Sequence, residues 1–162
     1  MPKKDGRVSE TQVGAIGEGL VASQLILASL GRLSPYRPVA DDSGIDLLVL
    51  DKQTGRVTPI QVKSRTKRLR RHPKIVHFQT RIATFREYKG AFLLAVLIAL
   101  ETLQVQRAWL IPMVRLAAVA RRQGDILVIR PSIDMYSSDQ YSAFRCEDLT
   151  EVARRLVKGR GD

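Results

Sequence analysis

The longest apolar run in the chain, AFLLAVLIAL from Ala91 to Leu100, is the feature that most limits how the chain can fold. A membrane-spanning helix needs about 20 apolar residues, so this run is too short to cross a bilayer. We predict a buried β-strand, because a strand-like segment from Arg107 to Pro112 follows and can pair with it. A buried helix is the alternative interpretation of the same run.

Capping residues and periodicity predict the elements around this strand. Ser9 and Gln12 have capping-box spacing, apolar residues then recur at helical spacing, and Gly31 is a plausible C-cap, so a helix is expected between them. Leu47–Leu50 and Val57–Ser64 predict the two strands of a hairpin, joined by turn residues from Asp51 to Arg56. The remaining expectations are strands at Lys74–Thr80 and Asp125–Pro131 and helices at Met113–Arg122 and Cys146–Lys158.

This order of elements predicts one mixed α/β domain over residues 1–162. The ends, 1–8 and 158–162, are expected to be flexible. No apolar run follows the lysines near the start, so no secretory signal and no membrane partner are expected, and a cytoplasmic location is predicted. The single cysteine, Cys146, excludes an intrachain disulfide and a cysteine-based zinc site, and we expect it to be chemically inert.

The net charge of +11 is concentrated in one stretch of the chain. Eleven Lys and Arg residues and no Asp or Glu lie between Lys52 and Arg86, whereas sixteen basic and sixteen acidic residues balance elsewhere. A basic excess this local indicates a protein that binds a polyanion. The alternative is a solvated basic face with no partner.

Three polar residues interrupt the otherwise apolar hairpin. Gln61 and Lys63 are two positions apart in one strand and therefore share a face, and Asp46 on the partner strand can lie beside them. Oxygen ligands of this kind suit Mg²⁺, which polarises a phosphate and activates water, while a nearby Lys balances developing charge. A polar cluster on a half-exposed sheet face is the other interpretation.

Three glycines, Gly14, Gly17 and Gly19, lie inside the first predicted helix. Each costs roughly 1 kcal/mol relative to Ala, so a close approach of the helix backbone to a neighbour or a ligand is expected. Glu18 lies among them and could supply a second carboxylate to a metal.

The chain resembles the PD-(D/E)xK nuclease superfamily in four features taken together. These are Gly44-Ile45-Asp46, the hairpin, Gln61-Val62-Lys63 and the preceding helix with Glu18. The match is to its D-QxK branch, which includes Mrr-like restriction enzymes and some homing endonucleases. The resemblance covers mainly Ser9 to Arg65. It implies a restriction-endonuclease-like fold, an α/β fold with a central mixed sheet flanked by helices.

The resemblance also implies roles for the matching residues. Asp46 and Gln61 would bind the metal, Lys63 would act on the attacking water, and Glu18 matches the helix glutamate of many members. The chain departs from the name-giving motif at Ile45, where the motif has Pro, and at Gln61, which replaces the usual acid. An uncharged amide should bind the metal more weakly than a carboxylate.

The sequence therefore predicts a metal-dependent endonuclease that hydrolyses phosphodiester bonds in DNA, with Mg²⁺ as cofactor and Mn²⁺ as a substitute. A homodimer is expected because both strands of a duplex must be cut, with Ala91–Leu100 or the last helix contributing to the contact. The alternatives are a weakly active or inactive nucleic-acid-binding module of the same fold and a basic protein that binds RNA or another protein. The residues expected to contact nucleic-acid phosphates are Arg65, Lys67, Arg68, Arg70, Arg71 and Lys74.

Three further side chains receive ordinary structural interpretations. His72 is expected in a loop, His77 on a strand face and Trp109 in the core.

Overall fold

The computed structural model describes residues 7–40 and 43–159, so parts of the expected flexible ends, 1–6 and 160–162, lie outside the described residues. The helices are α1 (Glu10–Ala28), α2 (Met113–Val119) and α3 (Leu149–Lys158), with two short 3-10 turns, η1 (Ile82–Thr84) and η2 (Ser142–Phe144). The strands are β1 (Leu33–Tyr36), β2 (Leu47–Asp51), β3 (Val57–Arg65), β4 (Phe78–Arg81), β5 (Phe92–Ala99), β6 (Gln104–Pro112), β7 (Arg121–Gln123), β8 (Ile126–Ile129) and β9 (Arg145–Cys146).

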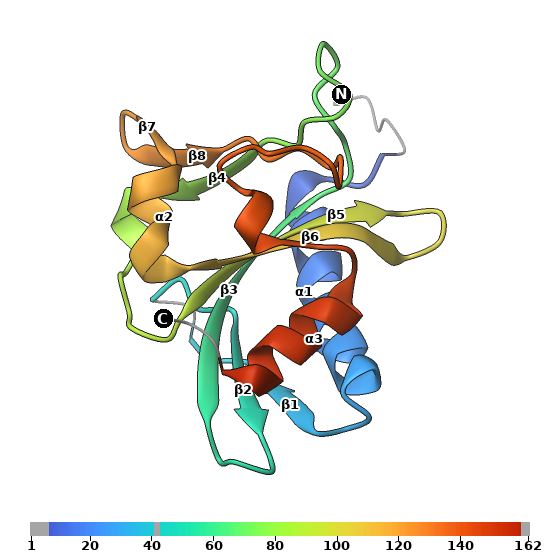
Figure 1. The fold of residues 1–162 in the computed structure, drawn as a ribbon, viewed down its shortest axis with the longest axis vertical. Helices are drawn as coiled ribbons and strands as arrows, with labels where there is room; N and C mark the ends of the chain where they lie inside the picture. The colour runs from blue at the N-terminus through green and yellow to red at the C-terminus, as the bar shows by residue number, and fades with distance from the viewer. Residues whose placement is uncertain (1–6, 41–42, 160–162) are drawn as a thin grey trace, which may run out of the picture.

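A six-stranded mixed sheet runs through the middle of the molecule in the order β1-β2-β3-β5-β6-β9 (Figure 1). Strands β3 and β5 pair in parallel, and the other neighbours are antiparallel. A second, three-stranded sheet has the order β4-β8-β7. The expected α/β class with a central mixed sheet flanked by helices is confirmed.

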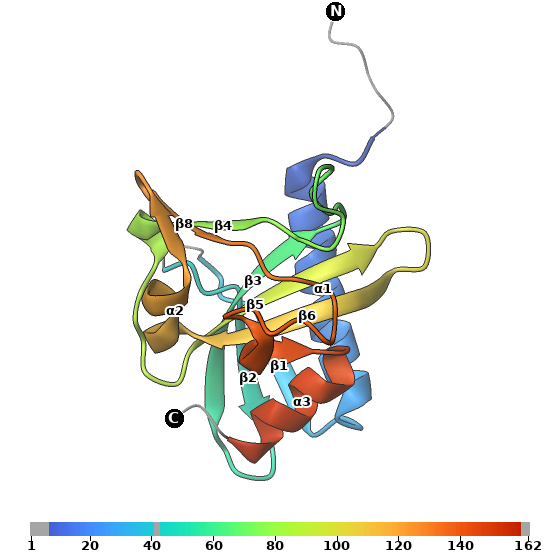
Figure 2. The same ribbon diagram turned by 45° about the horizontal axis from the view of Figure 1, so that its top comes forward.

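Strand β5 lies in the centre of the large sheet, and its side chains alternate between two apolar cores. Leu94 and Val96 pack with residues of α1 and α3 on one face. Leu93 and Ala95 pack on the other face with residues of α2 and of the small sheet. Figure 2 shows α1 and α3 apart from the layer that contains α2, β4 and β8.

This central position settles the interpretation of the apolar run. It forms a strand paired with β3 and β6, so the buried-helix alternative is wrong. The run is buried from Ala91 to Ile98, and therefore its expected contribution to a dimer surface is wrong as well. No helix among the described residues is long and apolar enough to cross a membrane.

Helix α1 begins as its sequence predicts, with reciprocal hydrogen bonds between Ser9 and Gln12 that complete the capping box. It ends earlier than expected, because Ser29 is the C-cap and Leu30 and Gly31 both take positive φ values of 51° and 78°. The chain reverses there through a hydrogen bond from the Gly31 N–H to the Ile26 carbonyl.

Several element boundaries differ from the expectations. The strand expected at Lys74–Thr80 begins only at Phe78, because Lys74 lies in a turn, Ile75 forms an isolated bridge, and residues 76–77 belong to no strand. The helix expected at Met113–Arg122 stops at Val119, and the following residues form β7, which pairs with β8. Strands β1 and β9 were not expected at all, since each is short and is defined only by its partner strand.

Candidate active site

Asp46 is held at the start of the β2–β3 hairpin by two hydrogen bonds to β3. Its backbone N–H donates to the Ile60 carbonyl at 2.9 Å, and its Oδ2 accepts from the Val62 N–H at 2.6 Å. A carboxylate that accepts from a backbone amide makes a short, charge-assisted bond. The carboxylate is therefore fixed against the segment from Gln61 to Lys63.

Gln61 and Lys63 point to the face of the sheet opposite α1. They pair with Leu93 and Ala95 of β5, which belong to the core on that face. Ile60 and Val62 alternate with them and pack in the core beneath α1 and α3. The expected sharing of one face by Gln61 and Lys63 is confirmed, and the register of β2 with β3 continues to place Asp46 opposite Gln61.

Gln61 is buried, with only 2% of its surface exposed, and its amide oxygen is already engaged. The Thr80 hydroxyl of β4 donates to Gln61 Oε1 at 3.1 Å. Sequence reasoning missed Thr80, because it comes from the small sheet and lies far along the chain. The available sequence signal was that Thr80 is two positions after the apolar Phe78 and so shares its strand face, and in the structure both are buried while Gln79 is exposed.

Gly44 lies two residues before Asp46 and packs against Gln61 and Thr84. Its φ of 69° lies in the left-handed region that favours glycine. A Cβ at this position would lie 2.5 Å from the Thr84 carbonyl oxygen and 3.1 Å from Gln61 Nε2. Gly44 therefore permits the close packing of Thr84 and Gln61 beside Asp46.

Glu18 lies on a helix turn that contacts β3 closely. A Cβ on its neighbour Gly17 would lie 1.7 Å from Ser64 Oγ, next to Lys63 in sequence. This contact explains one of the three helix glycines, whereas nothing lies within 4 Å of the corresponding position at Gly14. The Glu18 carboxylate lies 3.9 Å from the Arg37 guanidinium, so its ion pair is with Arg37.

The donor set near Asp46 is compatible with a hard cation. No group of three or more His, Cys, Asp and Glu that could hold a metal occurs within residues 7–40 and 43–159. Mg²⁺ does not require one, since it typically uses one or two carboxylates together with water and substrate phosphate oxygens. Asp46 and the Gln61 amide carry oxygen atoms of that kind, and Lys63 lies on the same strand face as Gln61.

The basic segment, residues 65–74, joins β3 to β4 and forms the green loop at the top of Figure 1. Lys67, Arg70 and Arg71 are exposed, and the structure shows no ion pair between them and any described residue. Arg65 and Arg68 donate to the His77 and Pro73 carbonyls.

Lys74 differs from the rest of the basic segment. Its ammonium lies 2.8 Å from the Asp134 carboxylate, which raises the pKa of Lys74 and lowers the pKa of Asp134. The local absence of acids in the sequence therefore does not leave Lys74 unpaired, because the tertiary structure supplies an acid from another part of the chain.

His77 lies just before β4, so its expected position on a strand face is wrong, and Arg130 and Arg65 are its cationic neighbours. Its Nδ1 accepts from Arg130 Nε at 3.2 Å, and its Nε2 lies 2.7 Å from Gln79 Nε2. Burial and the charges of Arg130 and Arg65 lower the pKa of His77, so the neutral ring is favoured.

Trp109 is a core residue, as the sequence predicts, and Cys146 is a core residue too. Trp109 is fully buried and packs edge-on against Phe78 with ring centroids 5.8 Å apart. Cys146 is fully buried too, and burial raises the pKa of its thiol to about 12.

Comparison with solved structures shows the same fold in two nucleases. A bacterial homing endonuclease, I-Ssp6803I, matches with a TM-score of 0.65 and 18% sequence identity over 94% of this chain and 95% of that chain. The Holliday junction resolvase Hjc of Archaeoglobus fulgidus matches with a TM-score of 0.51 and 16% identity over 87% of this chain and 95% of that chain. No protein-family model and no curated protein sequence matches the chain. The fold is therefore restriction-endonuclease-like.

Proposed function

We propose that the chain is a metal-dependent endonuclease that hydrolyses phosphodiester bonds in DNA. The observation that carries the proposal is the Asp46 carboxylate, held by the Val62 N–H beside Gln61 and Lys63. Both structural neighbours are nucleases with the same fold, and this supports the assignment. Membership of the D-QxK branch and a cytoplasmic location are part of the proposal.

Asp46 and the Gln61 amide oxygen would hold the cation. Glu18 is a further candidate ligand only if it leaves Arg37 and reaches the site from α1, on the opposite face of the sheet from Gln61. When bound, Mg²⁺ supplies polarisation of the phosphate and a more acidic water. Lys63 would orient that water and balance charge on the reacting phosphate. The exposed cations of the basic segment would bind flanking phosphates without reading sequence.

One observation favours a second candidate, a nucleic-acid-binding module with weak or lost cleavage. Gln61 is almost fully buried and its oxygen accepts from Thr80, so metal binding requires this oxygen to take a second partner. The same basic segment would then hold DNA or RNA without chemistry.

We also propose a homodimer, since cutting both strands of a duplex generally requires two active sites. The exposed apolar side chains that could form its contact lie at the end of α1 and in the β5–β6 turn. Leu27, Leu30 and Leu103 are 73%, 96% and 53% exposed. Light scattering of the wild-type protein and of a Leu27→Ser/Leu30→Ser variant tests this contact.

A nicking assay on supercoiled plasmid and on branched DNA tests the main proposal. Mg²⁺ or Mn²⁺ should support cleavage and a chelator should stop it. Lys63→Ala should abolish cleavage, whereas Lys52→Ala, at an exposed position in the hairpin turn, should not. Metal-independent binding without cleavage of either substrate would favour the binding module instead.

A further inference from the structure

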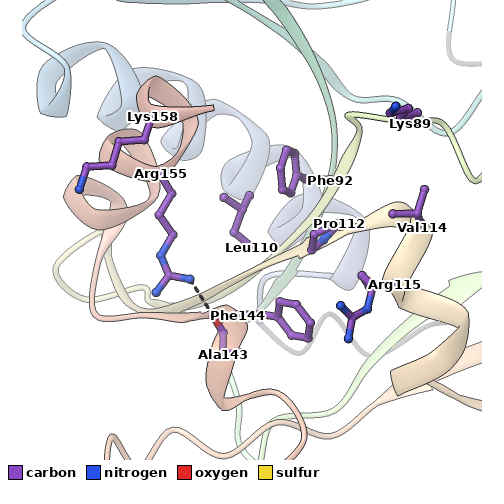
Figure 3. A pocket seen from close by; sticks show the side chains of 10 residues that line it. All are labelled: Lys89, Phe92, Leu110, Pro112, Val114, Arg115, Ala143, Phe144, Arg155 and Lys158. Atoms are coloured by element: carbon purple, nitrogen blue, oxygen red, sulfur yellow. Dashed lines mark hydrogen bonds between the residues drawn. The ribbon is translucent and has the colours of Figure 1, made fainter. Parts of the chain in front are cut away.

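A deep groove lies away from the candidate active site, between α2, α3 and the adjoining ends of β5 and β6 (Figure 3). Its volume is about 670 Å³, within the usual range of about 300–1,000 Å³ for small-molecule sites. Phe92 and Leu110 belong to the core beneath α3, on the face opposite Gln61 and Lys63. The groove therefore shares no residue with the site around Asp46.

The floor of the groove is apolar. Figure 3 shows Phe92, Leu110 and Pro112 in the middle of the view, with Val114 of α2 and Phe144 of η2 beside them. Val114 is 46% exposed, so part of this apolar surface faces water in the unliganded protein. A ligand with an apolar body would cover it.

The rim of the groove is positively charged. Among the described residues, four cationic ones and no acidic one line it, namely Lys89, Arg115, Arg155 and Lys158. Glu151 pairs with Arg155, which also donates to the Ala143 carbonyl, as the dashed line in Figure 3 shows. Lys89, Arg115 and Lys158 are exposed, and none of them forms an ion pair within the described part of the chain.

We propose that this groove binds a small amphipathic anion, with its apolar body on Pro112, Val114 and Phe144 and its anionic group at Lys89 and Arg115. Charge complementarity selects the sign of the ligand, because cations without an ion-pair partner surround the floor and no carboxylate of the described residues lines it. The apolar floor selects against inorganic anions, which gain nothing from its burial.

Two macromolecular occupants fit the groove less well. Single-stranded nucleic acid binds by stacking bases on open aromatic faces, but Phe92 is only 8% exposed. A peptide added as a strand to the edge of β6 requires backbone donors there. Strand β9 pairs only with Ala108 and Trp109 of β6. Beyond them Pro112 has no backbone N–H, so the free edge of β6 offers a peptide strand one hydrogen-bond donor fewer.

Calorimetric titration with octanoate, below its micelle concentration, tests the proposal on the wild-type protein. Octanoate should bind, whereas octylammonium, of the same apolar length and opposite charge, should bind at least about tenfold more weakly. Lys89→Gln/Arg115→Gln should weaken octanoate binding by about fivefold or more, as expected for losing two rim charges. Lys52→Gln removes an exposed charge outside the groove and should leave it unchanged.

A variant that fills the groove provides an independent check. Ala143 is exposed and lines the groove, and its contact with Arg155 is made by the backbone carbonyl. Ala143→Trp should therefore block octanoate while keeping every rim charge, and circular dichroism should show an unchanged fold. Equal binding of octanoate and octylammonium, or octanoate binding that survives both variants, would overturn the proposal. Displacement of octanoate by a thymidine oligonucleotide to the same extent from wild type and from Lys67→Ala/Arg70→Ala would overturn it in favour of nucleic acid bound in the groove.

Discussion

The Asp46 carboxylate and the Val62 backbone amide are joined by a 2.6 Å hydrogen bond that places the acid next to Gln61 and Lys63. Asp46→Asn keeps an oxygen that can accept this bond but removes the charge that would attract a cation. Cleavage should fall by about a hundredfold or more, with little change in the melting temperature. Plasmid nicking and circular dichroism measured on the same preparation check this prediction. Asp125→Asn, an exposed acid in the β7–β8 turn, should cut like wild type.

Gln61→Glu should bind Mn²⁺ more tightly than wild type, because an added carboxylate attracts a divalent ion more strongly than an amide does. The Thr80 hydroxyl can donate to either side chain, so the local packing should survive. Calorimetry with Mn²⁺ measures the affinity. Gln79→Glu adds the same charge at an exposed position of β4 and is the matched control. An equal gain in both variants would show that Gln61 is not a ligand.

Gly17→Ala should destabilise the protein strongly, while Gly14→Ala should stabilise it. An added Cβ at Gly17 would lie 1.7 Å from Ser64 Oγ, whereas at Gly14 it would meet nothing within 4 Å. Overpacking costs about 1–3 kcal/mol or more, and the loss of a helix glycine contributes about 1 kcal/mol of stability. Urea unfolding curves of the two variants measure both effects. Similar midpoints would mean that α1 does not approach β3 so closely.

Replacing Lys67, Arg68, Arg70 and Arg71 together by Ala should weaken binding to unrelated DNA sequences alike. The slope of log affinity against log salt should flatten by up to about 3 to 4 units if all four contact phosphates, since each contributes about 0.9. Fluorescence anisotropy across a salt series measures the slope. Lys74→Ala should change it least of the single variants, because Lys74 is paired with Asp134. An unchanged slope in the fourfold variant would show that the segment faces away from DNA.

Cys146 should resist alkylation in the native protein. It is fully buried and the pKa of its thiol is raised to about 12, so almost no reactive thiolate forms near pH 8. Iodoacetamide followed by mass spectrometry should show modification only after unfolding in denaturant. Rapid native labelling would mean that the β9 edge opens readily in solution.

The His77 imidazole should titrate with a midpoint below about 6.5, its usual value. Burial and the neighbouring Arg130 and Arg65 disfavour its charged form. When folding lowers the pKa of a base, its contribution to stability is fully present at pH values above the pKa of the unfolded state. That contribution is lost as the pH falls through the lower pKa of the folded state. NMR titration of the ring protons in wild type and Arg130→Gln checks this, and the variant should titrate at a higher pH.

The sequence by itself determined those features that depend on neighbouring residues. The Ser9–Gln12 capping box starts α1, the turn between Leu50 and Val57 forms the hairpin, and period-two alternation puts Gln61 and Lys63 on one face. Each of these depends on local hydrogen bonds or on the fixed side-chain period of a strand, which a short window of residues specifies. The general position of the candidate site could be predicted for this reason.

Only the tertiary structure decided the contacts between distant segments. The Thr80 hydroxyl donates to Gln61, and Asp134 forms an ion pair with Lys74. Ser64 leaves no room for a side chain at Gly17, whereas nothing restricts Gly14 in this way. Strands β1, β7 and β9 exist because partner strands supply their hydrogen bonds, and their own residues carry little strand preference. Such contacts depend on how the layers pack in three dimensions, and spacing along the chain does not encode that arrangement.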